Sequence, residues 1–339
     1  MDDKLKPMLA ININGDLSRL PEEFTATEKL DGNRLSVRLE DGGWIVRTRG
    51  GNVVDNINLD MSRMANQYIY DGELVHVKQY QKSMQIRQFL RGEIDISEID
   101  KTPTRRYFQM LNGELKKSKP DMSKMVYVIF DCLDKEPTSK GATYLKRREI
   151  LDKFKTIENQ HVKILGTLMQ AGRNFGSMVD LPVSFDADAI IPTIEDLFRT
   201  VIVAGGEGLM INDNNALYVN GVNDERTSVI LKYKHVETMD MLVEGVNLGS
   251  KTNPKWAKDL NLTLTKSNGD VVKVVVGNGL SRLEKELFGK DPSQIIGKIV
   301  EVNHYGLTQN KKNQGTKNYS LRHANITVIR HDKTSTSEH

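Results

Sequence analysis

Short stretches that alternate apolar and polar residues recur through the first two thirds of the chain, and they constrain its fold more than any other feature. A period of two is typical of β-strands, and Gly, Asn and Asp residues that favour turns separate the stretches. They cover residues 34–39, 44–48, 68–77, 126–133, 162–167, 208–211 and 228–234. Helical spacing appears at residues 144–157 and 194–203. Because the helices are interposed irregularly, the pattern argues against a doubly wound parallel sheet and predicts an α+β fold.

The pattern changes after residue 234. Strand-like stretches at residues 262–265, 270–276, 298–302 and 325–330 accompany a single helical stretch at residues 281–288. Several strands and one short helix are typical of a small β-barrel of the OB type. We therefore expect one domain at residues 1–234, a second at residues 235–333, and a disordered polar tail at residues 334–339.

Composition narrows the class of protein. The single cysteine, Cys132, excludes an internal disulfide framework and a cysteine-cluster metal site, so a reducing cytoplasm is the expected location. No run of about 18 apolar residues is present, and we expect no membrane partner. The formal charge is +3. Residues 1–234 hold 33 basic and 34 acidic side chains and residues 235–339 hold 15 and 11, which makes the C-terminal part the better polyanion surface.

The sharpest local motif is Glu-Lys-Leu-Asp-Gly-Asn-Arg at residues 28–34. An Asp-Gly pair favours a tight turn, so Lys29 would end a strand and point into any cleft that the sheet lines. A lysine with a lowered pKa is a nucleophile, and Arg34 could hold a phosphate or a ribose. From this heptapeptide alone, an ordinary hairpin with solvent-facing Lys29 and Arg34 stays equally open.

Further elements follow in a fixed order along the chain. They are Thr-Arg-Gly-Gly at 48–51, Asp-Gly-Glu-Leu-Val at 71–75, Tyr-Val-Ile-Phe-Asp at 127–131, Glu-Gly-Leu-Met-Ile at 207–211, Arg-Thr at 226–227 with Leu-Lys-Tyr-Lys at 231–234, Ser-Leu-Arg-His at 320–323 and Arg-His-Asp-Lys at 330–333. The series resembles the covalent nucleotidyltransferase superfamily of polynucleotide ligases and mRNA capping enzymes. It is most similar to the ATP-dependent DNA ligases of the compact phage or virus type, over residues 24–333.

This resemblance implies a fold and an activity. The fold would be a nucleotidyltransferase (adenylation) domain with ATP-grasp-like, mixed antiparallel sheets and helices, followed by an OB-fold barrel. The activity would be the sealing of 5′-phosphate/3′-hydroxyl nicks through a lysyl-AMP intermediate and an adenylated DNA end. The implied cofactors are ATP and Mg²⁺, with Mn²⁺ as a substitute. The implied partner is nicked duplex DNA, bound by a monomer that serves DNA replication, repair and recombination.

The resemblance also assigns roles to residues. Lys29 would attack the α-phosphate of ATP, and Mg²⁺ with the Lys232 and Lys234 pair would depress its pKa. Phe130 would stack on adenine, Met210 would cover the other face and Glu28 would be an adenine neighbour. The metal candidates are Glu73, which would also contact the ribose, and Glu207. The remaining ATP ligands would be Arg34, Arg49, Arg226, Arg330 and Lys333.

Some of the basic residues are also candidates for DNA binding. Arg49 and Arg226 would grip the 5′-phosphate of the nick. Residues 310–317, which include Lys311, Lys312 and Lys317, and residues 101–124, with seven basic side chains, could be loops that touch the DNA backbone. A solvated charged loop is the equally open alternative for each stretch.

The motifs also allow other functions. An RNA ligase is favoured by Thr-Glu-Lys at residues 27–29, because many DNA ligases carry an acid two residues before the lysine. The OB-like ending with Arg-x-Asp-Lys at residues 330–333 disfavours it. A capping enzyme is disfavoured because the spacing from Arg226 to Lys234 and the Ser-Leu-Arg-His run at residues 320–323 resemble ligases. Only 28 residues precede Lys29, which with the single cysteine argues against an NAD-dependent ligase. A non-catalytic OB-type nucleic-acid-binding protein is a further alternative, disfavoured because the catalytic residue types occur together.

Overall fold

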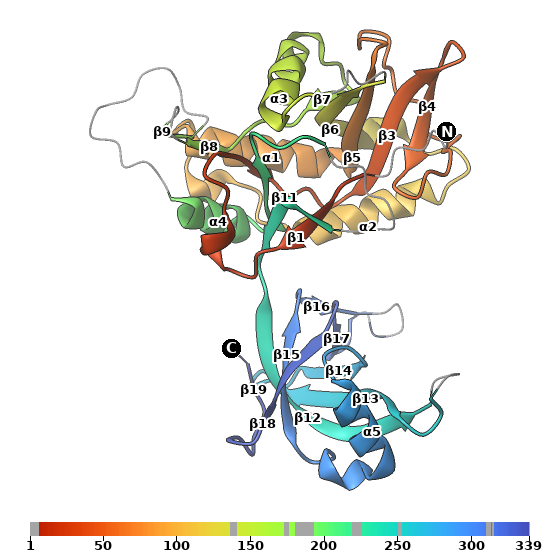
Figure 1. The fold of residues 1–339 in the computed structure, drawn as a ribbon, viewed down its shortest axis with the longest axis vertical. Helices are drawn as coiled ribbons and strands as arrows, with labels where there is room; N and C mark the ends of the chain where they lie inside the picture. Colours follow the sequence, from red (N-terminus) through yellow and green to blue (C-terminus); the bar gives the residue numbers. More distant parts are fainter. Residues whose placement is uncertain are drawn as a thin grey trace. The chain divides into compact units, whose positions relative to one another are not determined.

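The chain forms two compact units, Met1–Lys234 and His235–His339, in a computed structural model (Figure 1). The structure describes residues 7–135, 141–172, 176–179, 193–218, 226–249, 253–309, 313 and 315–338. Among these residues, no helix combines the length and the hydrophobicity needed to cross a membrane. Each unit has its own apolar core, so we describe them separately.

One sheet of the first unit is built from strands far apart in the sequence. Its spatial order is β1-β11-β10-β2-β8-β9. The bounds are Leu9–Asn12 for β1, Arg226–Lys234 for β11, Gly208–Asp213 for β10, Phe24–Glu28 for β2, Met169–Gly172 for β8 and Gly176–Val179 for β9. All pairs are antiparallel except β1 with β11.

The other sheet of this unit has the order β4-β3-β5-β6-β7. The bounds are Gly43–Thr48 for β4, Asn33–Glu40 for β3, Tyr68–His76 for β5, Met125–Asp134 for β6 and Val162–Ile164 for β7. Only β6 and β7 run parallel. The chain passes from the first sheet to this one between β2 and β3, which is the position of Lys29.

Helices cover these sheets (Figure 1). Their bounds are Val77–Leu90 for α1, Thr104–Leu115 for α2, Tyr144–Lys153 for α3 and Ile194–Val203 for α4. Helix α3 packs on β6, α4 on β10 and α2 on β5. Helix α1 packs on β5 and β6, while its Ile86 belongs to the core of the six-stranded sheet. It therefore ties the two sheets together.

The second unit is a curled, mainly antiparallel sheet with the order β16-β17-β14-β13-β12-β15-β18. The bounds are Leu307–Thr308 for β16, Asn318–Leu321 for β17, Val271–Val276 for β14, Ala257–Thr265 for β13, Glu237–Leu248 for β12, Ile299–His304 for β15 and Asn325–Arg330 for β18. Helix α5, Arg282–Lys290, packs against β13 and β12. Ser281 caps this helix, with Glu284 completing a capping box.

The predicted α+β class with mainly antiparallel sheets is confirmed, and helices lie where residues 144–157, 194–203 and 281–288 predicted them. Residues 101–124 differ from the predicted loop, because α2 occupies half of them. Thr104, Tyr107, Leu111 and Glu114 are buried along one side of α2, and this spacing of three and four residues holds the helix on β5.

The C-terminal tail also differs from the predicted disorder. Ser337 and Glu338 form strand β19, which pairs with Asp240 and Met239 of β12. The physical reason is electrostatic, since Glu338 also forms an ion pair with Lys266 at 2.8 Å. A short polar segment thus gains both backbone and side-chain partners.

Candidate active site

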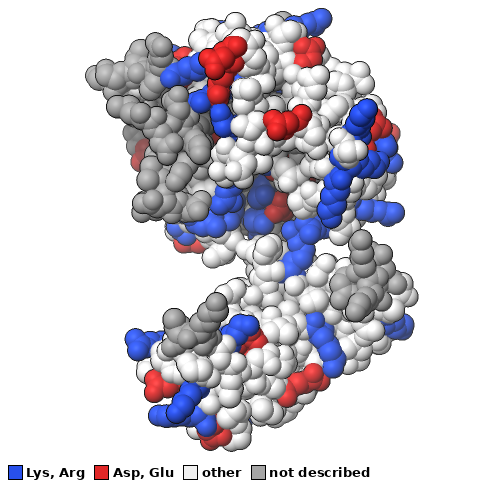
Figure 2. Space-filling model, turned by 90° about the vertical axis from the view of Figure 1, so that its right-hand side faces the viewer, with Lys and Arg blue, Asp and Glu red and all other residues white. Residues whose placement is uncertain are grey.

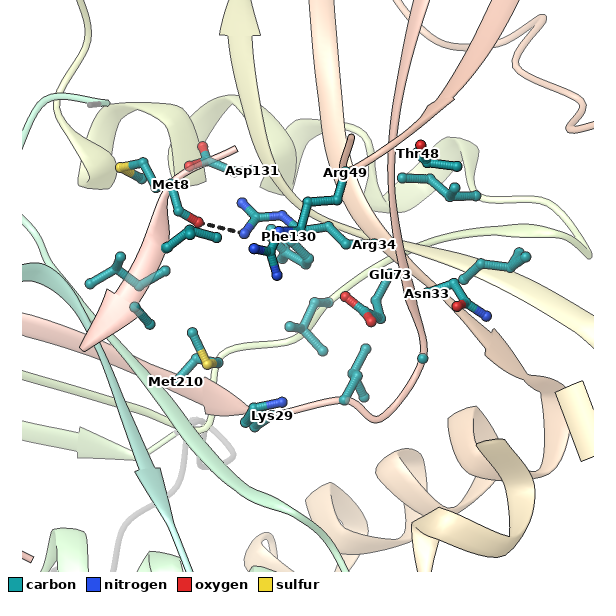
Figure 3. A pocket seen from close by; sticks show the side chains of 18 of the residues that line it. Met8, Lys29, Asn33, Arg34, Thr48, Arg49, Glu73, Phe130, Asp131 and Met210 are labelled. Atoms are coloured by element: carbon teal, nitrogen blue, oxygen red, sulfur yellow. Dashed lines mark hydrogen bonds between the residues drawn. The ribbon is translucent and has the colours of Figure 1, made fainter. Parts of the chain in front are cut away.

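A cavity of about 680 Å³ lies between the two sheets of the first unit. The six-stranded sheet contributes Met210 and Lys232 to its walls, and the five-stranded sheet contributes Arg34, Glu73 and Phe130. Figure 3 shows Lys29 and Met210 on one side of this space and Arg34, Arg49 and Glu73 on the other. On the face in Figure 2, basic side chains surround a hollow of this unit that also holds acidic side chains. The fold therefore gathers side chains from distant motifs around one space.

Three motif glycines allow this convergence. A Cβ on Gly32 would lie 2.3 Å from the Leu74 carbonyl oxygen and 2.8 Å from Cγ of Glu73. Gly208 has a φ of +132°, and a Cβ there would lie 2.1 Å from a backbone oxygen of β11. A Cβ on Gly72 would lie 2.6 Å from the Val128 carbonyl oxygen and 2.7 Å from the Tyr127 ring of β6. Glycine is required because neighbouring backbones occupy the space of a side chain.

Lys29 and Lys234 share the carboxylate of Glu207. The Lys29 Nζ lies 2.7 Å from Oε2 of Glu207, and the Lys234 Nζ lies 2.5 Å from Oε1. The backbone N–H of Lys29 also donates to the Gly208 carbonyl oxygen at 2.8 Å. This bond extends the β2–β10 ladder up to Lys29, the candidate nucleophile. Backbone pairing and an ion pair together fix the position of Lys29.

The protonation of Lys29 differs from the expectation. Burial alone would lower the pKa of Lys29, but the charges of Glu207 and Glu73 outweigh burial and raise the pKa above its ordinary value. The Lys232 and Lys234 pair does not depress the Lys29 pKa below normal, because Glu207 compensates the positive charges. The same lysines keep the pKa of Glu207 low although burial opposes this.

Lys232 is the lysine whose pKa is depressed. It lies in β11 and lines the cavity, and burial together with Arg226 and Lys234 lowers its pKa to about 8. Arg226 lines the cavity too, and its Nη1 donates to the Ala10 carbonyl at 2.7 Å. These cations form a positive wall along β11.

Arg34 is fixed by two partners. Its Nε and Nη2 donate to the two oxygens of Asp71 at 2.9 and 2.6 Å, and its Nη1 donates to the Met8 carbonyl at 2.6 Å. The guanidinium also lies 5.3 Å from the centre of the Phe130 ring. Tyr218 donates to Asp71 at 3.1 Å and completes the network. No role was predicted for Asp71, although its position two residues before Glu73 on the same strand was a signal.

Glu73 faces Arg34 across the β3–β5 ladder. Burial raises its pKa to about 7, although Lys29 and Arg34 pull it down. A carboxylate whose charge is this poorly compensated is suited to receive a cation. Within the described ranges, no three His, Cys, Asp or Glu side chains converge to hold a metal by themselves. Any ion there would need further oxygen ligands from its substrate or from water.

The other residues predicted for the site line the cavity, lie in the second unit or fall outside the described residues. Arg49 lines the cavity, just after β4. Glu28 contributes to the lining too. Its carboxylate is buried toward Ser83 of α1, and burial raises its pKa although Ser83 opposes this. Arg330, Lys333 and Lys317 lie in the second unit. Lys311 and Lys312 lie outside the described residues.

The fold is similar to those of several solved structures. One, named Pmar-Lig_Pre, has a TM-score of 0.70 and 18% sequence identity, with 97% of this chain and 68% of that chain covered. Another comes from a structure–function study of Lig E DNA ligases with a minimal DNA-binding scaffold. It has a TM-score of 0.54 and 21% identity, with 97% and 100% of the two chains covered. No curated protein matches the chain by sequence.

The family model for the ATP dependent DNA ligase domain matches residues 7–234. The match covers more than half of the chain and includes every residue that lines the cavity. It confirms the family that the order of the motifs predicted. The chain belongs to the ATP-dependent DNA ligase domain family.

Proposed function

We propose that this DNA ligase seals nicks in duplex DNA in three steps, with Lys29 as the nucleophile. The Lys29 amine forms a bond to the α-phosphorus of ATP, and pyrophosphate leaves with the electrons of the broken P–O bond. A 5′-phosphate oxygen of the nick then attacks this phosphorus and releases Lys29. Finally the 3′-hydroxyl oxygen attacks the 5′-phosphorus and AMP leaves, so that one phosphodiester forms.

The observation that carries this proposal is the position of Lys29 in the cavity, 2.7 Å from the Glu207 carboxylate. An amine is a nucleophile only after it loses its proton. Glu207 is an acceptor at hydrogen-bond distance for that proton, which is the geometry that general base catalysis needs. Arg34, Lys232 and Arg226 line the same space and supply positive charge for phosphate oxygens.

The nucleotide would lie across the cavity. Phe130 and Met210 are apolar walls contributed by different sheets, and an adenine ring between them is the arrangement that the resemblance implies. The charge of Lys29 acts on the pKa of Glu73, and Glu73 would contact the ribose. The fixed fork of Arg34 would contact phosphate or ribose oxygens with its remaining N–H groups.

Mg²⁺ fits this donor set. Glu73 and Glu207 offer hard carboxylate oxygens, and Mg²⁺ in such sites usually takes its other ligands from substrate phosphates and water. The ion would neutralise charge that develops on the phosphates. The raised pKa of Glu73 supports this assignment, since burial leaves its charge poorly compensated.

We assign residues 1–234 as the adenylation domain and residues 235–333 as an OB-fold barrel. The curled order of strands around β12 and the single helix α5 support the second assignment. Arg49 and Arg226 would bind the 5′-phosphate of the nick, with Lys311, Lys312 and Lys317 on the DNA backbone. Arg330 and Lys333 would orient the β- and γ-phosphates of ATP.

The test of substrate class is a sealing assay with matched nicks. The protein is loaded with α-labelled ATP and Mg²⁺ and then chased with a nicked DNA duplex or with the same nick in RNA. We expect transfer of label to the DNA 5′-phosphate and a sealed strand, with an affinity that falls steeply as salt rises. Sealing of the RNA nick alone would make the protein an RNA ligase, and binding without transfer would make it a non-catalytic binder.

A further inference from the structure

Arg330 and Lys333 of the second unit converge on one buried carboxylate. The Asp240 side chain is 0% exposed, and its Oδ1 accepts from Nη1 of Arg330 at 3.3 Å. The Lys333 Nζ donates to the other oxygen of Asp240, which also accepts from the Ser337 hydroxyl at 2.9 Å. A single side chain thus holds both cations.

Strand pairing explains why Asp240 lies there. On β12, Asp240 alternates with Met239 and Met241, which are buried in the apolar core of this unit. Its backbone pairs with Glu301 of β15 on one side and with Ser337 of β19 on the other. By the period of two, the Asp240 carboxylate leaves the sheet on the face opposite the core. Arg330, Lys333 and the C-terminal strand cover it there.

The guanidinium of Arg330 is held in one orientation. Its Nε and Nη2 donate to Asp332 at 2.9 and 2.7 Å, and its Nη1 donates to both Asp240 and Glu301 at 3.3 Å. The carboxylates differ in exposure, because the Asp332 side chain is 65% exposed while Asp240 is fully buried. A phosphate oxygen can therefore approach Arg330 from the solvent side, whereas the Asp240 side is closed.

The burial of Asp240 limits the movement of the two cations. A buried carboxylate that loses its partner is strongly unfavourable, because no water replaces the lost interaction. Arg330 and Lys333 therefore stay bound to Asp240 when they meet an anion, which approaches Arg330 from its exposed side. Fixed donors aimed at phosphate need little reorganisation during the reaction.

We propose that Asp240 is a positioning residue for the adenylation step, which it supports by holding Arg330 and Lys333 in the orientation that receives the leaving pyrophosphate. This inference rests on the proposed function of those two cations. Asp240 itself touches neither nucleotide nor DNA. Its effect is confined to the step in which ATP is cleaved, since the later steps involve no pyrophosphate.

The test separates the steps with the full-length protein. Asp240→Asn is compared with the unchanged protein in enzyme adenylation by α-labelled ATP and in the sealing of a nick that already carries AMP. We expect kcat/KM for ATP to fall about tenfold or more, as when a charge-assisted contact is lost. Sealing of the pre-adenylated nick should change by less than about twofold. Equal losses in both reactions would overturn the proposal.

Glu301→Gln is the matched control, because Glu301 also contacts Arg330 but its side chain is partly exposed. We expect it to leave adenylation within about threefold, as for an exposed ion pair. Melting temperatures of all variants report folding. Should Asp240→Asn fail to fold, Ser337→Ala removes one partner of Asp240 and keeps every charge. It should slow adenylation about twofold to fivefold and spare pre-adenylated sealing, and no change in adenylation would contradict the proposal.

A double-mutant cycle tests the route of the effect. If Asp240 acts through Lys333, Asp240→Asn adds little to the adenylation loss of Lys333→Ala. Fully additive losses would contradict this route. Normal adenylation by both Arg330→Ala and Lys333→Ala would instead overturn the role proposed for the cations, which distinguishes the two failures.

Discussion

The two charged clusters of this ligase are built in opposite ways. In the cavity of the first unit, Lys29 and Lys234 share one carboxylate, and Lys232 stands beside them. In the second unit, Arg330 and Lys333 meet three carboxylates, those of Asp240, Glu301 and Asp332. The first cluster has an excess of cations and the second has an excess of acids.

This difference indicates which charged side chains are available to bind a substrate. A cluster with excess positive charge attracts polyphosphate directly and lowers the pKa of a lysine within it, as for Lys232. A cluster with excess acid holds its cations in place, also when an anion approaches them. The carboxylate shared by Lys29 and Lys234 should therefore matter more to activity than the exposed acids around Arg330.

The largest effect is expected for Glu207→Gln. The amide cannot accept the Lys29 proton, so the rate of enzyme adenylation should fall about a hundredfold or more. Quenched-flow labelling with α-labelled ATP measures this rate. Glu93→Gln, whose side chain is 47% exposed, is the control and should behave like the unchanged protein. Adenylation at a normal rate by Glu207→Gln would break the comparison between the two clusters.

The next effect concerns the close approach of Gly32 to β5. In Gly32→Ala, the new Cβ would meet the Leu74 carbonyl and displace Glu73, so we expect a loss of about 2 to 4 kcal/mol in the free energy of unfolding and of most activity. Gly113→Ala in α2 is the control, because nothing lies within 4 Å of its Cβ. It should gain about 0.5 to 1 kcal/mol. Urea unfolding measures both free energies, and equal values for the two variants would contradict the account.

The smallest effect is a bend in a pH profile. Lys232, with a pKa of about 8, is charged below that pH and neutral above it. Since its positive charge helps to hold phosphate, log kcat/KM for ATP should bend downward above about pH 8. Lys232→Arg stays charged and should lack the bend. The same bend in both proteins would assign it to another group.

The sequence predicted which motifs meet at the cavity better than it predicted the contacts that hold their side chains in position. Lys29, Arg34, Glu73 and Phe130 do line one cavity, because each motif carries its own strand and turn signals. The position of Arg34 depends on Asp71, and that contact requires the register of β3 on β5, which a single sequence does not specify.

The sequence did not predict helix α1, and the reason is physical. Its buried residues include Gln79, Lys82 and Ser83, so polar side chains occupy the face that should have been apolar. Strand β1 was also missed, since it has only four residues and pairs with a strand more than two hundred positions away. Such long-range pairings leave no local period in the sequence.

The most direct test of the central claim is the position of AMP on the protein. The protein is incubated with α-labelled ATP and Mg²⁺, digested under conditions that preserve phosphoramidates, and mapped by mass spectrometry. The account predicts one AMP adduct, on Lys29, and no label on Lys29→Ala. An adduct on Lys232 or Lys234, or label retained by Lys29→Ala, would contradict it.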